Sequence, residues 1–250
     1  MTEIECAISM RKPHRTFDRT SVCARSFQEL RRPMTFATAL CFSALSALGS
    51  EIALVDFTGE DPTTTFQWRA QNDPVMGGQS YSTVTVEHGL LNFTGRCAIV
   101  PSLQAPGFIT AVSGNQRASE ADPTFNDVSS CEGLKINAKS VNAYGGFRVS
   151  FGHAHPIGGK FFAYGYKAHF SPTVGSYGDI TVPFKNFTDF WDDATGEPIH
   201  KCTDVPRYCP DVKTLTNMKT MSIWAEGVEG DVQLFVKSIS GYGCSGATTA

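Results

Sequence analysis

The sequence predicts an all-β fold, an antiparallel sandwich of two β-sheets of the jelly-roll type. Apolar and polar residues alternate over short segments, so that Phe147, Val149 and Phe151, for example, share one face of a strand. Gly, Pro, Asn and Asp, the residues typical of turns, separate these segments. We find no amphipathic helix of convincing length, and about ten short strands at this spacing are typical of two packed sheets.

The expected strands follow one another along most of the chain. They cover Ile52–Phe57, Phe66–Arg69, Ser80–Glu87, Leu90–Thr94, Phe108–Val112, Leu134–Ala138, Phe147–Phe151, Phe162–Phe170, Ile180–Phe184, Met221–Ala225 and Val232–Val236. The run from Phe162 to Phe170 is the longest alternating one. We expect Met221–Ala225 to pair with Val232–Val236, because the two segments alternate alike and are close in sequence.

The chain before the first strand resembles a targeting region. The sequence predicts a disordered basic extension at 1–33, a signal-peptide-like segment at 34–50, the β-sandwich domain at 51–240 and a flexible tail at 241–250. A basic start, a short apolar run and the small residues Ala47 and Gly49 are typical of a secretory signal, which we expect to be removed close to Ser50.

Secretory or extracellular localisation follows from that signal. Mitochondrial targeting is the alternative, because residues 10–32 are rich in Arg, although Asp18 and Glu29 are atypical of a presequence. The apolar run is too short for a membrane span, and none is expected in the mature chain. With 21 Lys and Arg against 24 Asp and Glu, a net charge of -3, nucleic acid is not an expected partner.

The most specific stretch runs from Phe66 to Ser80. After the aromatic pair Phe66 and Trp68 come Asn72 and Asp73, then Pro-Val-Met, and then two glycines. Proline fixes φ and pushes the residue before it toward extended backbone, and glycine permits positive φ or close approach of another backbone. The sequence therefore predicts a strand that leaves its sheet through a rigid corner.

The spacing Trp-x-x-x-Asn-Asp-Pro-Val-Met-Gly-Gly-x-Ser resembles the signature of the complex I intermediate-associated protein 30 family. Further matches follow in the expected order, at 91–95, 107–110, 131–136 and 180–187, so the resemblance covers about residues 52–240. It implies a galactose-binding-like jelly roll. Known members are assembly factors or binding modules rather than enzymes, so the resemblance also implies that the chain holds another protein, without a cofactor.

We predict that the corner contributes to partner binding, with a second contribution from Trp224. The candidate residues are Trp68, Asn72, Asp73, Met76, Gly77, Gly78, Gln79 and Trp224. The alternative for the corner is that it only closes the sandwich. Trp224 and Ile223 are neighbours on one expected strand, so their side chains point to opposite faces. With Ile223 in the core, Trp224 faces either a partner or the long loop 190–217.

Five cysteines follow the signal-like segment, so at least one thiol is unpaired within the chain. Cys202 and Cys209 flank six residues in the loop 190–217, and we predict a disulfide between them. The pairing of Cys97, Cys131 and Cys244 stays open, except that strand directions place Cys97 and Cys131 at opposite ends of the sandwich.

Two glycosylation sequons begin at Asn92 and Asn186, and we prefer Asn92 on the expectation that its side chain points to solvent. We predict no metal site. His153 and His155, with His169 as a third residue, lack supporting carboxylates or cysteines, and the carboxylates of Asp192 and Asp193 are expected to face water. Asp56 is a loose candidate for a structural calcium.

Nothing in the sequence supports catalysis. We find no Gly-x-Ser-x-Gly elbow, no phosphate-binding loop and no Gly-x-Gly-x-x-Gly after a strand. Two hypotheses remain. The first is a protein-binding module of the assembly-factor or chaperone kind, and the second is a secreted ligand-binding jelly roll whose ligand is a glycan.

Overall fold

The structure is a computed structural model that describes residues 50–59, 66–114, 122–152, 165–192 and 195–245. All of these belong to the unit Ser46–Ala250. The predicted extension at 1–33 and nearly all of the signal-like segment lie outside the described residues, as do His153, His155 and Asp193.

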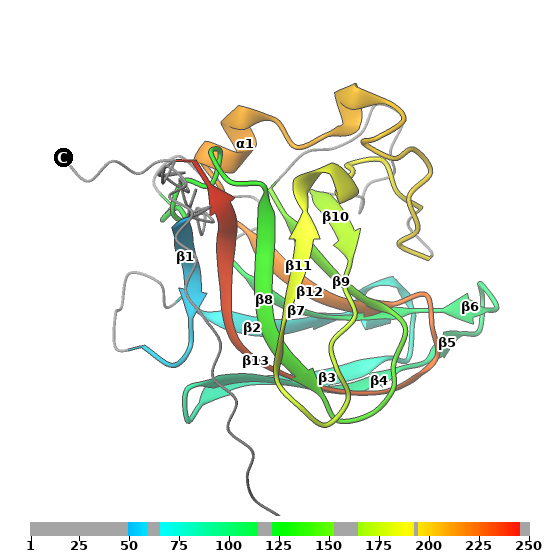
Figure 1. Ribbon diagram of the computed structural model, residues 1–250. Coiled ribbons are helices and arrows are strands. Elements are labelled where there is room, and N and C mark those ends of the chain that lie inside the picture. Colours follow the sequence, from blue (N-terminus) through cyan, green and yellow to red (C-terminus); the bar gives the residue numbers. More distant parts are fainter. Residues whose placement is uncertain (1–49, 60–65, 115–121, 153–164, 193–194, 246–250) are drawn as a thin grey trace, which may run out of the picture. The chain divides into compact units, whose positions relative to one another are not determined.

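Six of the described strands form the first sheet, in which every pair is antiparallel (Figure 1). Its order is β11-β8-β13-β4-β3, and β1 pairs with β13 beside this path. The strands are β1 (Ser50–Asp56), β3 (Tyr81–Glu87), β4 (Leu90–Cys97), β8 (Gly133–Ser140), β11 (Gly178–Pro183) and β13 (Gly230–Cys244).

The second sheet has five described strands, again all antiparallel, in the order β10-β9-β12-β7-β2. They are β2 (Trp68–Asn72), β7 (Phe108–Ser113), β9 (Phe147–Phe151), β10 (Tyr166–His169) and β12 (Met221–Glu226). The remaining elements are the hairpin of β5 (Ile99–Val100) and β6 (Ala105–Pro106), the 3₁₀ helices η2 (Asp73–Met76), η3 (Phe184–Asn186) and η4 (Pro206–Tyr208), and the helix α1 (Val212–Thr216).

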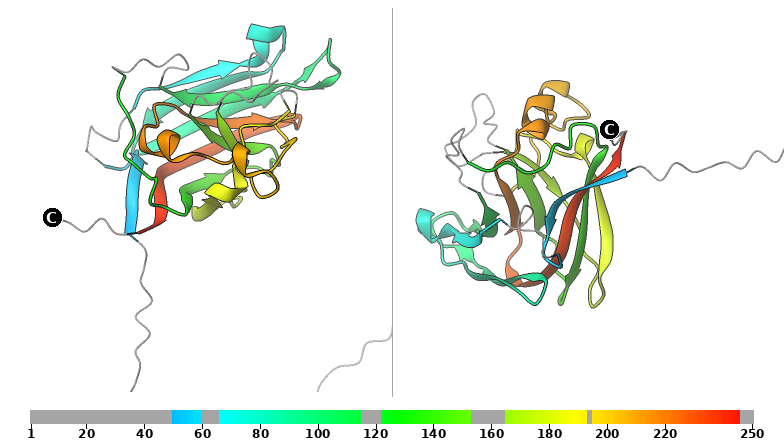
Figure 2. Two further views of the ribbon diagram at one scale, coloured as in Figure 1. Left: turned by 90° about the horizontal axis from the view of Figure 1, so that it is seen from above. Right: turned by 90° about the vertical axis from the view of Figure 1, so that its left-hand side faces the viewer.

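The hydrophobic core fills the space between the two sheets, whose layers are visible in Figure 2. Leu91 and Phe93 of the first sheet and Val149 and Ile223 of the second are fully buried. The alternation that predicted the strands therefore places one side of each sheet in the core, because successive side chains of a strand point to opposite faces. The predicted antiparallel sandwich is confirmed.

The predicted pairing of Met221–Ala225 with Val232–Val236 is wrong. β12 pairs with β7 and β9, whereas β13 pairs with β4, β8 and β1 in the other sheet. The chain crosses between sheets at Gly227, and both strands then turn their apolar side chains toward the common core. Alternation specifies the buried face of a strand but not the strand beside it.

The end of the domain also differs from the expectation of a tail from residue 241. β13 continues to Cys244, where a disulfide joins it to Cys131, just before β8. The Cys202–Cys209 disulfide predicted from sequence is present in the structure. Among the described cysteines Cys97 is free and buried, and its Sγ donates to the carbonyl oxygen of Gly107 at 3.0 Å.

We expect Cys97 of the native protein to resist alkylation by iodoacetamide at pH 8. Burial raises the pKa of the Cys97 thiol to about 11, and only the thiolate reacts. Peptide mass spectrometry after labelling with and without denaturant measures this directly. Labelling of Cys97 at the same rate in both conditions would contradict the prediction.

Within the part of the chain that the structure describes, no helix is long and apolar enough to cross a membrane.

Candidate functional site

The corner predicted from sequence is built around the carboxylate of Asp73. Asp73 opens η2 and is only 2% exposed. Its Oδ1 accepts from the backbone N of Ser80 at 2.8 Å, and its Oδ2 accepts from Ser80 Oγ at 2.5 Å and from the backbone N of Phe108 at 3.2 Å. Because a buried carboxylate needs such donors, Asp73 ties the corner to the start of β7.

Two glycines leave room for this carboxylate. A Cβ added at Gly78 or at Gly107 would overlap the Asp73 side chain. Gly77 ends η2 with φ at 81°, and its backbone N bonds the carbonyl of Pro74. Gly78 and Gly107 thus make space for the Asp73 side chain, and Gly77 adopts a backbone angle that other residues rarely adopt. The signature and Gly107 therefore pack together around Asp73.

The structure corrects the prediction that Asp73 contacts a partner, because the side chain is buried. Asn72 is half-buried. With its amide oriented to satisfy both its oxygen and its nitrogen, Oδ1 accepts from the backbone N of Ser82 at 3.0 Å and Nδ2 donates to Ser82 Oγ at 2.7 Å. Trp68 is also half-buried and packs edge-on against Phe57.

The remaining corner candidates divide in another way. Gln79 and Gly77 are exposed and Gly78 is half-buried, while the side chain of Met76 lies outside the described set. Gln79 is therefore the one non-glycine candidate of the corner whose described side chain is exposed.

The corner also fixes the base of the β5–β6 hairpin. Ser80 Oγ accepts from the backbone N of Ala98 at 2.9 Å, and the Asp73 carboxylate accepts from the backbone N of Phe108, so the chain is held on both sides of the hairpin. The hairpin extends away from the sandwich in Figure 1, where β5 and β6 are labelled.

Large apolar side chains are exposed around this hairpin. Leu103 in its turn is 59% exposed and Ile99 on β5 is 36% exposed. Tyr81, the residue after Ser80 and the first of β3, is 62% exposed. Sequence reasoning missed all three, because alternation indicates which residues of a strand share a face but not whether that face is covered, and it says nothing of Leu103 in the turn.

The second region of interest is the outer face of the β10-β9-β12-β7-β2 sheet, where Trp224 lies. The loop after η3 folds over this face and brings Trp191 against Trp224, with ring centroids 6.2 Å apart. Trp224 is 9% exposed, and its Nε1 donates to Ser150 Oγ at 2.7 Å. Trp224 is thus covered by the loop, which is the alternative to partner contact that the sequence left open.

A buried lysine lies between these two indoles. Lys167 Nζ is 3.4 Å from the ring centroid of Trp191 and 3.9 Å from that of Trp224. It also pairs with the buried carboxylate of Glu226 at 2.7 Å. Attraction to the two aromatic faces and to the carboxylate offsets the desolvation of the ammonium group.

Arg148 extends this charged cluster toward solvent. It is buried, and its Nε donates to the carbonyl oxygen of Gly196 at 3.0 Å and lies 3.6 Å from Glu226. Its terminal nitrogen bonds Glu197, a carboxylate whose side chain is 57% exposed. Register explains the cluster, because Arg148 stands opposite both Trp224 and His169 on the neighbouring strands.

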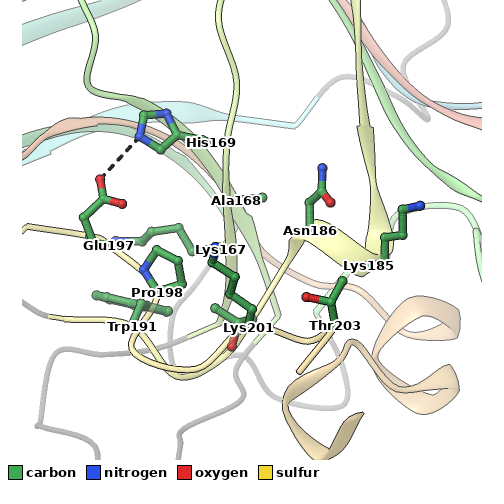
Figure 3. Close-up of a pocket in the computed structure, with 12 residues that line it drawn as sticks. Lys167, Ala168, His169, Lys185, Asn186, Trp191, Glu197, Pro198, Lys201 and Thr203 are labelled. Atoms are coloured by element: carbon green, nitrogen blue, oxygen red, sulfur yellow. Dashed lines mark ion pairs between the residues drawn. The ribbon is translucent and has the colours of Figure 1, made fainter. Parts of the chain in front are cut away.

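A pocket of about 320 Å³ opens beside this cluster, between β10, η3 and the loop (Figure 3). Its lining comprises Lys167, Ala168, His169, Lys185, Asn186, Thr188, Trp191, Gly196, Glu197, Pro198, Lys201 and Thr203. His169 Nε2 lies 3.5 Å from Glu197. Burial lowers the pKa of His169, as does Arg148 nearby, while Glu197 opposes both effects.

The predicted glycosylation sequons occupy different settings. Asn186 is exposed at the pocket, whereas Asn92 is half-buried on β4, where its Oδ1 accepts from Thr94 Oγ1 at 2.7 Å. Glycosylation stays a prediction, and the exposure of the two side chains favours Asn186 over Asn92.

No group of three or more His, Cys, Asp or Glu residues that could hold a metal ion occurs among the described residues. Asp56 bonds the backbone N and the hydroxyl of Thr58.

Comparison with known proteins gives one family. The sequence model of the family described as Complex I intermediate-associated protein 30 matches residues 55–207 of this chain. No curated protein sequence matches the chain significantly.

Solved structures of similar fold include two from Clostridium thermocellum. One is a family 11 carbohydrate-binding module in complex with a β-1,3-1,4-mixed-linked tetrasaccharide, with TM-score 0.49, 17% identity, and coverage of 80% of this chain and 98% of that chain. The other is the family 11 module of the cellulosomal cellulase Lic26A-Cel5E, with TM-score 0.47, 16% identity, and coverage of 78% of this chain and 96% of that chain.

Proposed function

The chain belongs to the complex I intermediate-associated protein 30 family, and from that premise we propose that it is a non-catalytic protein-binding module of the assembly-factor kind. The family name refers to association with an assembly intermediate. By analogy, the partner of this chain is another protein that has not yet reached its final complex. Family membership suggests this class of function but does not identify a surface.

The observation that carries the proposal is the projecting β5–β6 hairpin. Its base is fixed to the buried carboxylate of Asp73 through Phe108 and to Ser80 through Ala98. Exposed apolar side chains on and beside an element that projects from the fold are typical of protein interaction sites. We therefore assign partner binding to the surface of Tyr81, Ile99 and Leu103, which we call the hairpin surface.

We expect Leu103→Asp to reduce the amount of co-purifying protein by about tenfold, because a charge at the centre of an apolar contact must be desolvated. Affinity capture with quantitative mass spectrometry, normalised to the bait, measures the effect. Val212→Asp is the matched control, since Val212 is 68% exposed on α1, away from the hairpin. Equal capture by both variants would remove the hairpin surface from the proposal.

A second candidate function is the binding of a small ligand, for which the pocket beside β10 is the supporting observation. Trp191 and Trp224 are both buried, so neither offers an open ring face on which a sugar could stack. A glycan in this pocket would therefore depend on its polar and charged lining.

For the compartment, we propose the secretory pathway, with the mitochondrion as the alternative. The two disulfides among the described cysteines support an oxidising environment.

A further inference from the structure

The pocket beside β10 carries more positive than negative charge. Its lining, as far as the structure describes it, has three lysines and one carboxylate, that of Glu197. The whole chain has a net charge of -3, so this excess is local and is not a reflection of composition. A concave site with one sign of charge concentrates ions of the opposite sign.

Two of these lysines have no ion-pair partner in the part of the chain that the structure describes. Lys167 pairs with Glu226, and Glu197 is shared by Arg148 and His169. Among the described residues neither Lys185 nor Lys201 forms an ion pair, and both are exposed. Figure 3 shows Lys201 rising from the loop toward the middle of the pocket, with His169 and Glu197 on one side and Lys185 and Asn186 on the other.

The walls of the pocket are held in place by the fold. Thr188 exchanges backbone hydrogen bonds with Lys167, which fixes the segment after η3 to the edge of β10. Lys201 directly precedes Cys202, whose disulfide with Cys209 closes its part of the loop. A lysine on a constrained loop loses less conformational entropy on binding than one on a free loop.

From these contacts we propose that the pocket binds a small molecule that carries a carboxylate or phosphate group, with Lys201 as the principal anion-binding residue. Lys185 contributes charge at the rim. The volume of about 320 Å³ is at the small end of ligand sites, which suits a single monosaccharide or a comparably small metabolite.

This inference is independent of the proposed protein-binding function, because the hairpin surface is built from other residues. Leu103→Asp should therefore leave anion binding unchanged. If the anion binds but Leu103→Asp does not reduce partner capture, only the protein-binding proposal fails. If Leu103→Asp reduces partner capture but no anion binds, only the anion-binding proposal fails.

Calorimetric titration of the whole chain with inorganic phosphate, D-glucuronate and D-glucose tests the class of ligand. We expect at least one of the two anions to bind about tenfold more tightly than glucose, since only the anions engage the lysines. Tighter phosphate binding assigns a phosphate ligand, and tighter glucuronate binding assigns an acidic sugar or a similar carboxylate. Binding of neither anion, or equal binding of glucose, overturns the proposal.

Substitution of the lysine tests the location. Lys201→Glu is expected to weaken binding of the tighter anion by at least about tenfold, because it replaces attraction with repulsion. Lys213→Glu is the matched control, since Lys213 is an exposed lysine on α1 outside the pocket, and we expect a change of less than about twofold. Both side chains are exposed, so both variants should keep the native melting temperature. Equal losses in the two variants would exclude Lys201 as the anion-binding residue.

Discussion

Asp73→Ala is expected to lower the free energy of unfolding by about 3 to 5 kcal/mol, because it leaves buried donors that had bonded a carboxylate without an acceptor. The donors are the backbone N and Oγ of Ser80 and the backbone N of Phe108. A loss of this size is a large share of the stability of a typical domain. Urea denaturation followed by far-ultraviolet circular dichroism measures it.

The matched control for Asp73→Ala is Gln79→Ala, a substitution in the same corner at an exposed side chain. We expect Gln79→Ala to leave the unfolding midpoint unchanged. If Asp73→Ala is equally harmless, the carboxylate does not hold the corner together. If Gln79→Ala alone reduces partner capture, the binding surface extends from the hairpin into the corner.

Glu226→Gln is expected to destabilise the protein by a similar amount, about 3 to 5 kcal/mol, because removing one member of a buried ion pair leaves the other charge desolvated without its counter-ion. Glu226 is buried and lies 2.7 Å from Lys167 Nζ and 3.6 Å from Arg148 Nε. The same urea titration applies, and Glu229→Gln serves as the control, because that carboxylate pairs at the surface with Arg96.

A double-mutant cycle separates this electrostatic effect from loss of packing. Lys167→Met removes the buried cation while keeping an apolar stem between Trp191 and Trp224. In that background Glu226→Gln should cost clearly less than in the native protein, because directly interacting residues are not additive. Part of the cost remains, since Arg148 also faces Glu226. An unchanged cost in the Lys167→Met background would show that the ion pair is not the source of the effect.

The sequence by itself determined most of the described strands and which face of each is buried, although β5 and β6 are not among the expected segments. The alternation of Phe147, Val149 and Phe151 acts through a local rule, the period of two along a strand, and therefore needs no knowledge of neighbours. The signature corner is also largely local, because Pro74 and Gly77 set backbone angles that are allowed to few other residues.

The role of Asp73 in that corner was decided by contacts across the chain. Its carboxylate bonds Phe108, 35 residues away, and the space it occupies depends on Gly107. From sequence alone, an Asn-Asp pair before proline is equally compatible with a presented side chain and with a buried one. Only the approach of β7 makes Asp73 a structural residue.

The buried cluster of Lys167, Arg148 and Glu226 shows most clearly that sequence patterns do not determine which surfaces the tertiary structure covers. Lys167, Arg148 and Glu226 lie at outward-facing positions of their strands, and the alternation therefore predicts solvent around them. The loop that carries Trp191 crosses this outer face and buries all three. Periodicity reports which side of a sheet a residue occupies, whereas the covering of that side depends on where a distant loop folds. That placement, like the partner of β12 and the Cys131–Cys244 bond, is fixed only by packing in the complete tertiary structure.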